Sequence, residues 1–170
     1  LSPSPGHGSE PASYFRHDGG VAADDRRLPD DFEDDRMLVW RQELAPGHST
    51  PCISGNLIFL TTFDADASQL ATLALHRDSG VVRWRKTVPT SDIEPFHPVG
   101  SPAACTIACD GRQLYVFFGS YGLICYALDG EPQWTHRMGP FQDEFGASSS
   151  PILVDGKVIL NQDHDINSFL

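Results

Sequence analysis

The sequence predicts an all-β protein, a β-propeller fragment of about two complete four-stranded blades and part of a third. Two observations predict it. Short apolar segments alternate with turn signals along most of the chain, and tryptophan recurs at Trp40, Trp84 and Trp134, 44 and 50 residues apart. A period in the forties with four strands per unit is typical of propeller blades.

The clearest unit spans 101–134. It opens with Ser101-Pro102, and its four short apolar segments are separated by three turn signals at Asp110-Gly111, Gly119 and Asp129-Gly130. That spacing predicts a four-stranded antiparallel meander. The run 114–118 is apolar at consecutive positions, so both faces of this strand must be covered, as in stacked blades.

The remaining segments follow in order. Residues 1–36 are rich in Pro, Gly, Ser and Asp and predict a mobile, mostly irregular acidic leader. Residues 37–44 predict a first strand, followed by a blade over 48–88. A second blade covers 101–138, and a partial third covers 150–170. Because the last unit stops before its own tryptophan, we expect the parent protein to continue after Leu170.

Each full unit keeps the motif Gly-x-x-x-Trp, as Gly80 to Trp84 and Gly130 to Trp134. We expect each indole to bury its ring at the seam between blades while the ring N–H donates to a backbone carbonyl. The glycine permits the tight turn into the last strand. These residues, with Trp40, are the structural repeat.

The four cysteines are Cys52, Cys105, Cys109 and Cys125. None forms a C-x-x-C pair and no histidine has zinc-ligand spacing, so no metal site is predicted. Cys105 and Cys109 are too far apart along one strand for a disulfide. Cys105 and Cys125 could approach each other on different strands, but buried thiols that act as small hydrophobic groups are favoured. The cysteine pattern does not decide between an oxidising and a reducing compartment.

Charge and hydropathy argue against a nucleic-acid-binding protein and against a transmembrane helix. The net charge of −11 and pI near 4.8 argue against a nucleic-acid footprint, which needs clustered Lys and Arg. No apolar run approaches the roughly 18 residues of a transmembrane helix. The sequence also holds no nucleophile elbow, Ser-His-Asp order or phosphate-binding loop, so no catalytic residue is predicted.

The repeats resemble those of the quinoprotein-like (PQQ-like) β-propellers, a family that includes the BamB-like propellers abundant in planctomycete-type bacteria and the quinoprotein alcohol dehydrogenases. The resemblance covers about residues 14–170. It rests on these motifs: Phe15-Arg16-His17-Asp18-Gly19-Gly20-Val21-Ala22, Leu28-Pro29, Val39-Trp40, His48-Ser49-Thr50-Pro51, Ala74-Leu75…Asp78-Ser79-Gly80-x-x-x-Trp84, Phe117-Phe118-Gly119-Ser120, Tyr126-Ala127-Leu128-Asp129-Gly130-x-x-x-Trp134 and Ser168-Phe169-Leu170.

The resemblance implies a noncatalytic scaffold that mediates protein–protein contacts, located in the periplasm or cell envelope. The candidate binding residues lie in predicted rim loops, since loops on a rigid scaffold usually carry binding. They are Phe96, His97, Phe141, Asp143, Glu144, Asp163, His164 and Asp165. The partner is unidentified and no cofactor is expected.

Two alternatives stay open. One is part of a PQQ- and calcium-dependent dehydrogenase, although the sequence lacks the adjacent cysteine pair that stacks on the quinone in that family. The other is a sensor or ligand-binding domain of a larger protein. Because propellers host many unrelated activities, fold alone does not choose among them.

Overall fold

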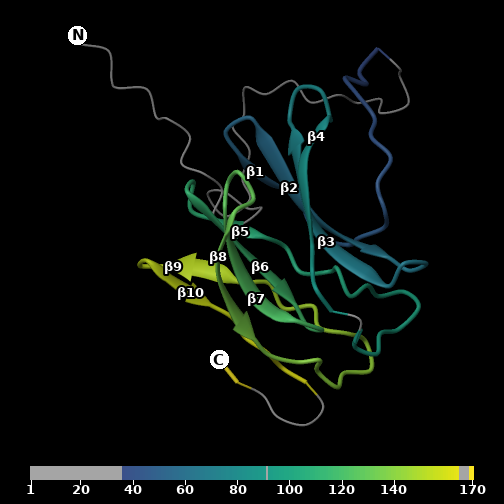
Figure 1. Cartoon of the computed structure of the whole chain (residues 1–170), viewed down its shortest axis with the longest axis vertical. Coiled ribbons are helices and arrows are strands. Elements are labelled where there is room, and N and C mark those ends of the chain that lie inside the picture. The colour runs from purple at the N-terminus through teal and green to yellow at the C-terminus, as the bar shows by residue number, and fades with distance from the viewer. Residues whose placement is uncertain (1–35, 91, 165–168) are drawn as a thin grey trace.

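The computed structural model describes residues 36–90, 92–164 and 169–170. These residues form two four-stranded antiparallel sheets and a two-stranded hairpin, which confirms the predicted propeller-fragment architecture (Figure 1). The first sheet contains β1 (Cys52–Ser54), β2 (Leu57–Asp64), β3 (Gln69–His76) and β4 (Val82–Thr87). The second contains β5 (Ala108–Cys109), β6 (Gln113–Phe118), β7 (Gly122–Ala127) and β8 (Pro132–Arg137). The hairpin is β9 (Ile152–Val154) and β10 (Lys157–Ile159).

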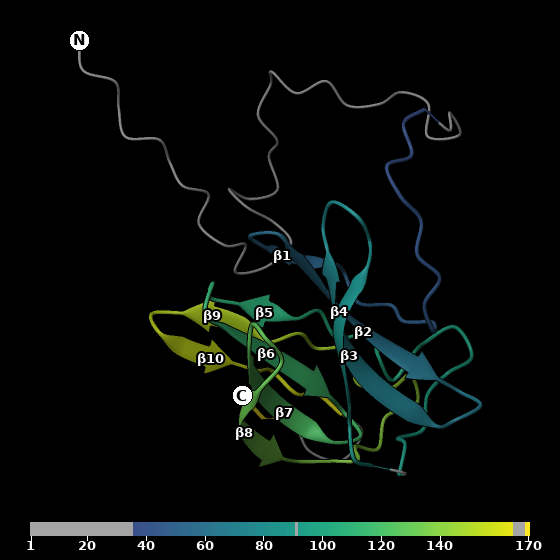
Figure 2. The same cartoon turned by 45° about the horizontal axis from the view of Figure 1, so that its top comes forward.

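Each four-stranded sheet is a blade whose strands pair in sequence order. Strand β1 contacts β5, and β5 contacts β9, so the first strands of successive units lie side by side at one inner edge. Figures 1 and 2 both show the second blade between the first blade and the β9–β10 hairpin. The last strand of each blade lies away from that edge, and every residue of β8 is exposed.

Hydrogen bonds at the inner edge repeat from unit to unit. The Thr50 N–H donates to Oγ1 of Thr106 over 3.1 Å, and the Thr106 N–H donates to Oγ of Ser150 over 2.9 Å. Each of these residues lies two positions before the first strand of its unit. One inter-blade contact is therefore made twice, which identifies the three units as successive copies.

Ser101-Pro102 opens the second unit in the sequence, and the first strand of that unit, β5, begins only at Ala108. Oγ of Ser101 accepts the Ala103 N–H over 3.1 Å in a turn, and Pro102 has no N–H to give to a strand ladder. Thr106 therefore occupies the position that Thr50 holds in the first blade.

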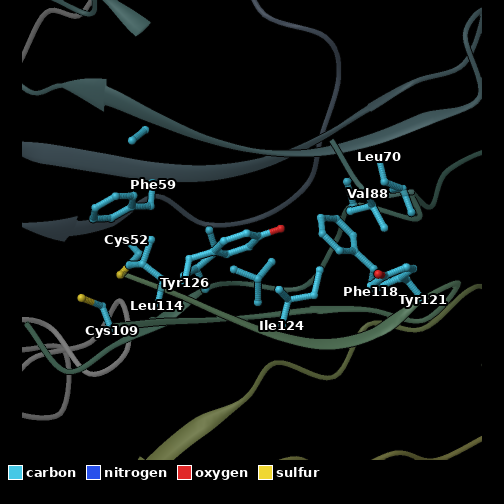
Figure 3. Close-up of a cluster of buried hydrophobic side chains, with 14 residues drawn as sticks. Cys52, Phe59, Leu70, Val88, Cys109, Leu114, Phe118, Tyr121, Ile124 and Tyr126 are labelled. Carbon is cyan, nitrogen blue, oxygen red and sulfur yellow. The ribbon is translucent and has the colours of Figure 1, made fainter. Parts of the chain in front are cut away.

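The main core lies between the two blades. Leu114, Val116 and Phe118 on β6 face the first blade, where they join Phe59 and Leu70 (Figure 3). The intervening β6 residues point to the opposite face, so Phe117 packs in a second cluster with Leu123, Phe141 and Leu160. The apolar run 114–118 is thus buried on both faces, as its composition predicted.

The tryptophan seam is present between units. The ring N–H of Trp84 donates to the Leu128 carbonyl over 2.9 Å, and a Cβ added at Gly130 would lie 2.8 Å from the Trp84 ring. Both blades carry a β-bulge just before the tryptophan, so that Trp84 pairs with Ala74. The glycine of one blade thus receives the tryptophan of the preceding unit, a packing role beyond the tight turn that the sequence suggested.

Two sequence predictions near the tryptophans are wrong. Residues 37–44 form no strand, because the described residues place no hydrogen-bonding strand beside them. Trp40 nevertheless occupies its seam, where its ring N–H donates to the Arg77 carbonyl over 2.7 Å. Trp134 is 42% exposed and packs on Tyr115 of its own blade, since residues 150–164 and 169–170 supply no turn to cover it. The predicted leader, apart from Arg36, lies outside the described residues.

Candidate functional site

The connection from β4 to β5 and the connection from β8 to β9 lie against each other. The Ala147 N–H of the second donates to a carboxylate oxygen of Glu94 in the first over 3.0 Å. The His97 and Phe145 rings stack at 5.4 Å between centroids. A Cβ added at Gly100 would lie 2.7 Å from the Phe145 carbonyl oxygen, so the backbones are in close contact there. We call the described residues of this pair of connections, 88–90, 92–107 and 138–151, the loop face.

Glu94 is the centre of the contact between these connections. Its side chain is 1% exposed, and its backbone N–H donates to Oγ of Ser120 over 3.0 Å. Oε1 accepts the Ala147 N–H, whereas Oε2 is buried without a hydrogen-bond partner and lies against Gly119. A side chain at Gly119 would collide with this oxygen. The fold therefore encloses a carboxyl group between the β6–β7 turn and the β8–β9 connection.

The enclosure changes the acidity of Glu94. Burial penalises the charged form and raises the pKa of Glu94 to about 7; the hydrogen bond from Ala147 opposes this rise, and the nearby Asp143 carboxylate adds to it. A neutral carboxyl group can donate a hydrogen bond and tolerates the dry site better than a carboxylate. Near neutral pH this group is therefore present in both protonation states.

Apolar side chains emerge on the loop face around this buried centre. Phe145 is 60% exposed, Val99 76% and Phe96 37%. Phe96 packs edge-on against Phe63 at 5.7 Å, and Nδ1 of His97 accepts the Val99 N–H over 3.2 Å. The residues that carry this patch are thus held by contacts to the blades and to each other.

Carboxylates lie directly beside the patch. Glu144 is exposed, and Asp143 is half-buried with Oδ1 accepting the Phe145 N–H over 2.9 Å. Of the predicted binding residues, the structure therefore brings Phe96, His97, Asp143 and Glu144 into one region. The sequence analysis did not predict the exposed residues Phe145 and Val99 as binding residues, although Phe145 directly follows the predicted acidic pair Asp143 and Glu144.

The other predicted binding residues are placed differently. Phe141 was expected to be at least half-exposed but is 9% exposed, because it packs on Phe117 at 6.2 Å and on His164 at 4.9 Å between ring centroids. His164 is half-buried in that contact, whereas Asp163 is exposed. Asp165 lies outside the described residues. Glu94 was also missed, since a lone glutamate in a loop gives no sequence signal of burial.

The described ranges 36–90, 92–164 and 169–170 contain no group of three or more His, Cys, Asp or Glu side chains that could hold a metal ion. All four cysteines are buried, none forms a disulfide, and none is adjacent in sequence to another. These residues therefore do not fit a quinone cofactor with calcium as the resemblance described it. In the same ranges, no helix is long and apolar enough to cross a membrane.

Comparison with known proteins adds one result. No family model matches the sequence, and no curated protein matches it. Among solved structures, the chain is similar to BamB from Moraxella catarrhalis, with a TM-score of 0.56 and 18% sequence identity. The match covers 72% of this chain and 36% of that chain, so this chain spans about a third of the BamB structure. At this identity the likeness shows a shared propeller fold.

Proposed function

We propose that this chain is part of a noncatalytic propeller scaffold that binds a protein partner on its loop face. The observation that carries the proposal is the exposure of Phe145, Val99 and Phe96 on connections that are locked together by Glu94. Exposed apolar groups on a preorganised surface lose little conformational entropy when a partner binds. The similarity to the BamB fold is consistent with this use.

The chemistry of the loop face restricts the partner. Aromatic and aliphatic side chains form the centre, with Asp143 and Glu144 beside them. The chain as a whole carries a net charge of −11. Such a surface favours a protein segment that presents apolar side chains flanked by Lys or Arg, because opposite charge speeds encounter and rejects acidic partners. We propose an envelope location on the resemblance to BamB-like propellers alone.

The test is site-specific crosslinking in cells that express the full-length parent. A photoreactive amino acid replaces Phe145, and a matched control carries it at Val81, which is 57% exposed on the β3–β4 turn. Purified partner is then titrated against wild-type protein, Phe145→Ser and Val81→Ser. We expect one protein to crosslink at residue 145 only, and Phe145→Ser to weaken its binding at least tenfold.

Two outcomes would contradict the proposal. Equal crosslinking at residues 145 and 81, or equal affinity of Phe145→Ser and wild type, would remove the loop face as the binding surface. Dye-linked alcohol oxidation by the full-length parent after addition of PQQ and calcium would contradict the noncatalytic scaffold and support the dehydrogenase alternative.

A further inference from the structure

Cys52 and Cys109 meet at the inner edge, on different blades. Cys52 is the first residue of β1, and Cys109 is the last residue of β5, the strand of the second blade that contacts β1. Both belong to the core cluster between the blades, and Figure 3 shows the two sulfurs close together at one end of that cluster. They lie 57 positions apart in the sequence, so the fold alone brings them together.

A side-chain hydrogen bond joins Cys52 to Sγ of Cys109. The same sulfur accepts the Gly111 N–H over 3.3 Å and a further hydrogen bond from Ser54. Three hydrogen bonds thus meet at one sulfur atom. This arrangement stabilises a thiolate at Cys109 and leaves Cys52 as its proton donor.

The acidities of the four thiols follow this geometry. The hydrogen bond from Cys52 and that from Gly111 lower the pKa of Cys109 to about 7, although burial opposes them. The hydrogen bond to Cys109 and burial raise the pKa of Cys52. Burial, with a smaller effect of the nearby Asp110 carboxylate, raises the pKa of Cys125 to about 11, and burial also raises the pKa of Cys105. Cys105 and Cys125 fall in different core clusters, so they do not form the pair that the sequence left open.

We propose that Cys52 and Cys109 form a dithiol site that is oxidised to a disulfide between the first and second blades. The oxidant is a disulfide of the small-molecule class, of which oxidised glutathione is the probe. The Cys109 thiolate attacks one sulfur of the oxidant, which forms a mixed disulfide and releases one thiolate. Cys52 gives up its proton, and its sulfur attacks Sγ of Cys109, which forms the intramolecular bond and releases the second thiol. Two electrons and the proton of Cys52 pass in total from the cysteine pair to the oxidant, which leaves as one thiolate and one thiol.

The position of the pair has two consequences. Both thiols are buried, at 2% and 0% exposure, but exposed residues of the strand-connecting turns lie close to them in sequence, Gly55 three positions after Cys52 and Asp110 directly after Cys109. Oxidation by a small disulfide therefore needs only a local opening of these turns. Once formed, the bond links the first strands of two blades and restricts the unfolded chain across a long loop, which raises the melting temperature.

The experiment uses the reduced full chain in buffer with oxidised glutathione from pH 6 to 9. Thiols are counted after denaturation, and the disulfide is located by peptide mapping without reduction. We expect the count to fall from four to two, with Cys52 joined to Cys109 and a rate that rises through about pH 7 as Cys109 ionises. The melting temperature should rise by roughly 5–10 °C on oxidation and return on reduction.

Variants separate this pair from the other thiols. Cys125→Ser should still lose two thiols, whereas Cys109→Ser should retain all three under the same conditions. Four thiols remaining in wild type, a mapped bond between Cys105 and Cys125, or equal oxidation of Cys109→Ser would each overturn the proposal. The wild-type mapping needs no substitution, so the test holds even where a serine variant folds poorly.

Discussion

The indole of Trp84 lies on Gly130 of the next blade and donates its ring N–H to the carbonyl of Leu128. Trp40 makes the same pair of contacts with Gly80 and with the carbonyl of Arg77. An aromatic ring therefore covers a backbone position where a Cβ would collide with it. Both glycines also have positive φ, +69° at Gly80 and +87° at Gly130. The motif from Gly80 to Trp84 therefore takes part in two seams: Gly80 contacts Trp40 of the preceding unit, and Trp84 contacts Gly130 of the following one.

Gly130→Ala should destabilise the protein more than Gly55→Ala does. Both positions have positive φ, so alanine costs about 1 kcal/mol at each from backbone strain alone. A Cβ at residue 130 would also strike the Trp84 ring, whereas nothing lies within 4 Å of a Cβ at residue 55. We expect about 1–3 kcal/mol of additional loss for Gly130→Ala, measured by urea unfolding. Equal losses would mean that the ring does not rest on this glycine.

Trp84→Ala should cost more stability than Trp134→Ala. Trp84 packs on Phe59 and Tyr126 at 5.9 and 6.2 Å between ring centroids, in addition to its seam contact. Its removal should cost about 3 kcal/mol. Trp134 is 42% exposed, so its removal should cost about 1–2 kcal/mol. Thermal melts of the two variants compare the losses, and a larger effect at Trp134 would contradict the placement of both rings.

Glu94 should make stability fall as the pH rises from about 4.5 to about 7. Its pKa is 4.5 in the unfolded chain and about 7 in the folded one, so the folded state binds the extra proton in this window. The stabilisation is complete below pH 4.5 and is lost as the pH passes through 7, by about 3 kcal/mol. Glu94→Gln keeps an acceptor for the Ala147 N–H and does not ionise, so its stability should lack this decline.

The matched control for that titration is Glu144→Gln, which removes an exposed carboxylate of the same loop face. Urea unfolding at half-unit steps of pH gives the three profiles. Wild type and Glu144→Gln should decline in parallel while Glu94→Gln does not. Parallel profiles for all three proteins would show that Glu94 ionises normally and is not enclosed.

Thr106→Val should weaken the contact between the first two blades. The hydroxyl of Thr106 is the acceptor for the Thr50 N–H, and valine has the same shape without that oxygen. An unsatisfied N–H at this partly buried position should cost about 1–3 kcal/mol. Thr135→Val on the exposed strand β8 is the control and should change stability by less than about 0.5 kcal/mol. Hydrogen exchange at Thr50 should quicken in the first variant alone.

The sequence was sufficient for the strands and for the seams, because both depend on local patterns. Alternating turn signals marked the strand ends around β2, β3, β6 and β7, and the recurring indoles marked the inter-blade contacts. The sequence was insufficient where a residue's structure depends on contacts with residues far away along the chain. Residues 37–44 have strand-forming composition but no partner strand among the described residues. Ser101-Pro102 resembles Thr50-Pro51 in sequence, but Thr106 is the residue of the second unit that takes the structural position of Thr50.

Remote contacts also explain what was missed in the site. Glu94 is buried only because Ser120 and Ala147, 26 and 53 residues away, close over it. The Cys52–Cys109 pair arises from the contact between β1 and β5, whereas the sequence analysis favoured buried thiols and left open only a pair of Cys105 and Cys125. Phe141 lies in a loop as predicted, but it is buried there because it packs on Phe117 and His164. The spacing of residues along the chain carries no signal for these long-range contacts.

A double-mutant cycle between Trp84 and Gly130 tests most directly the claim that each tryptophan seats on the glycine of the next blade. Urea unfolding is measured for wild type, Trp84→Ala, Gly130→Ala and the double variant. Without the indole, Gly130→Ala should cost only the backbone strain seen at Gly55, so the coupling energy should be about 1–3 kcal/mol. A coupling energy within error of zero would show that the ring and the glycine do not touch, and would contradict the packing of each tryptophan on the glycine of the next blade.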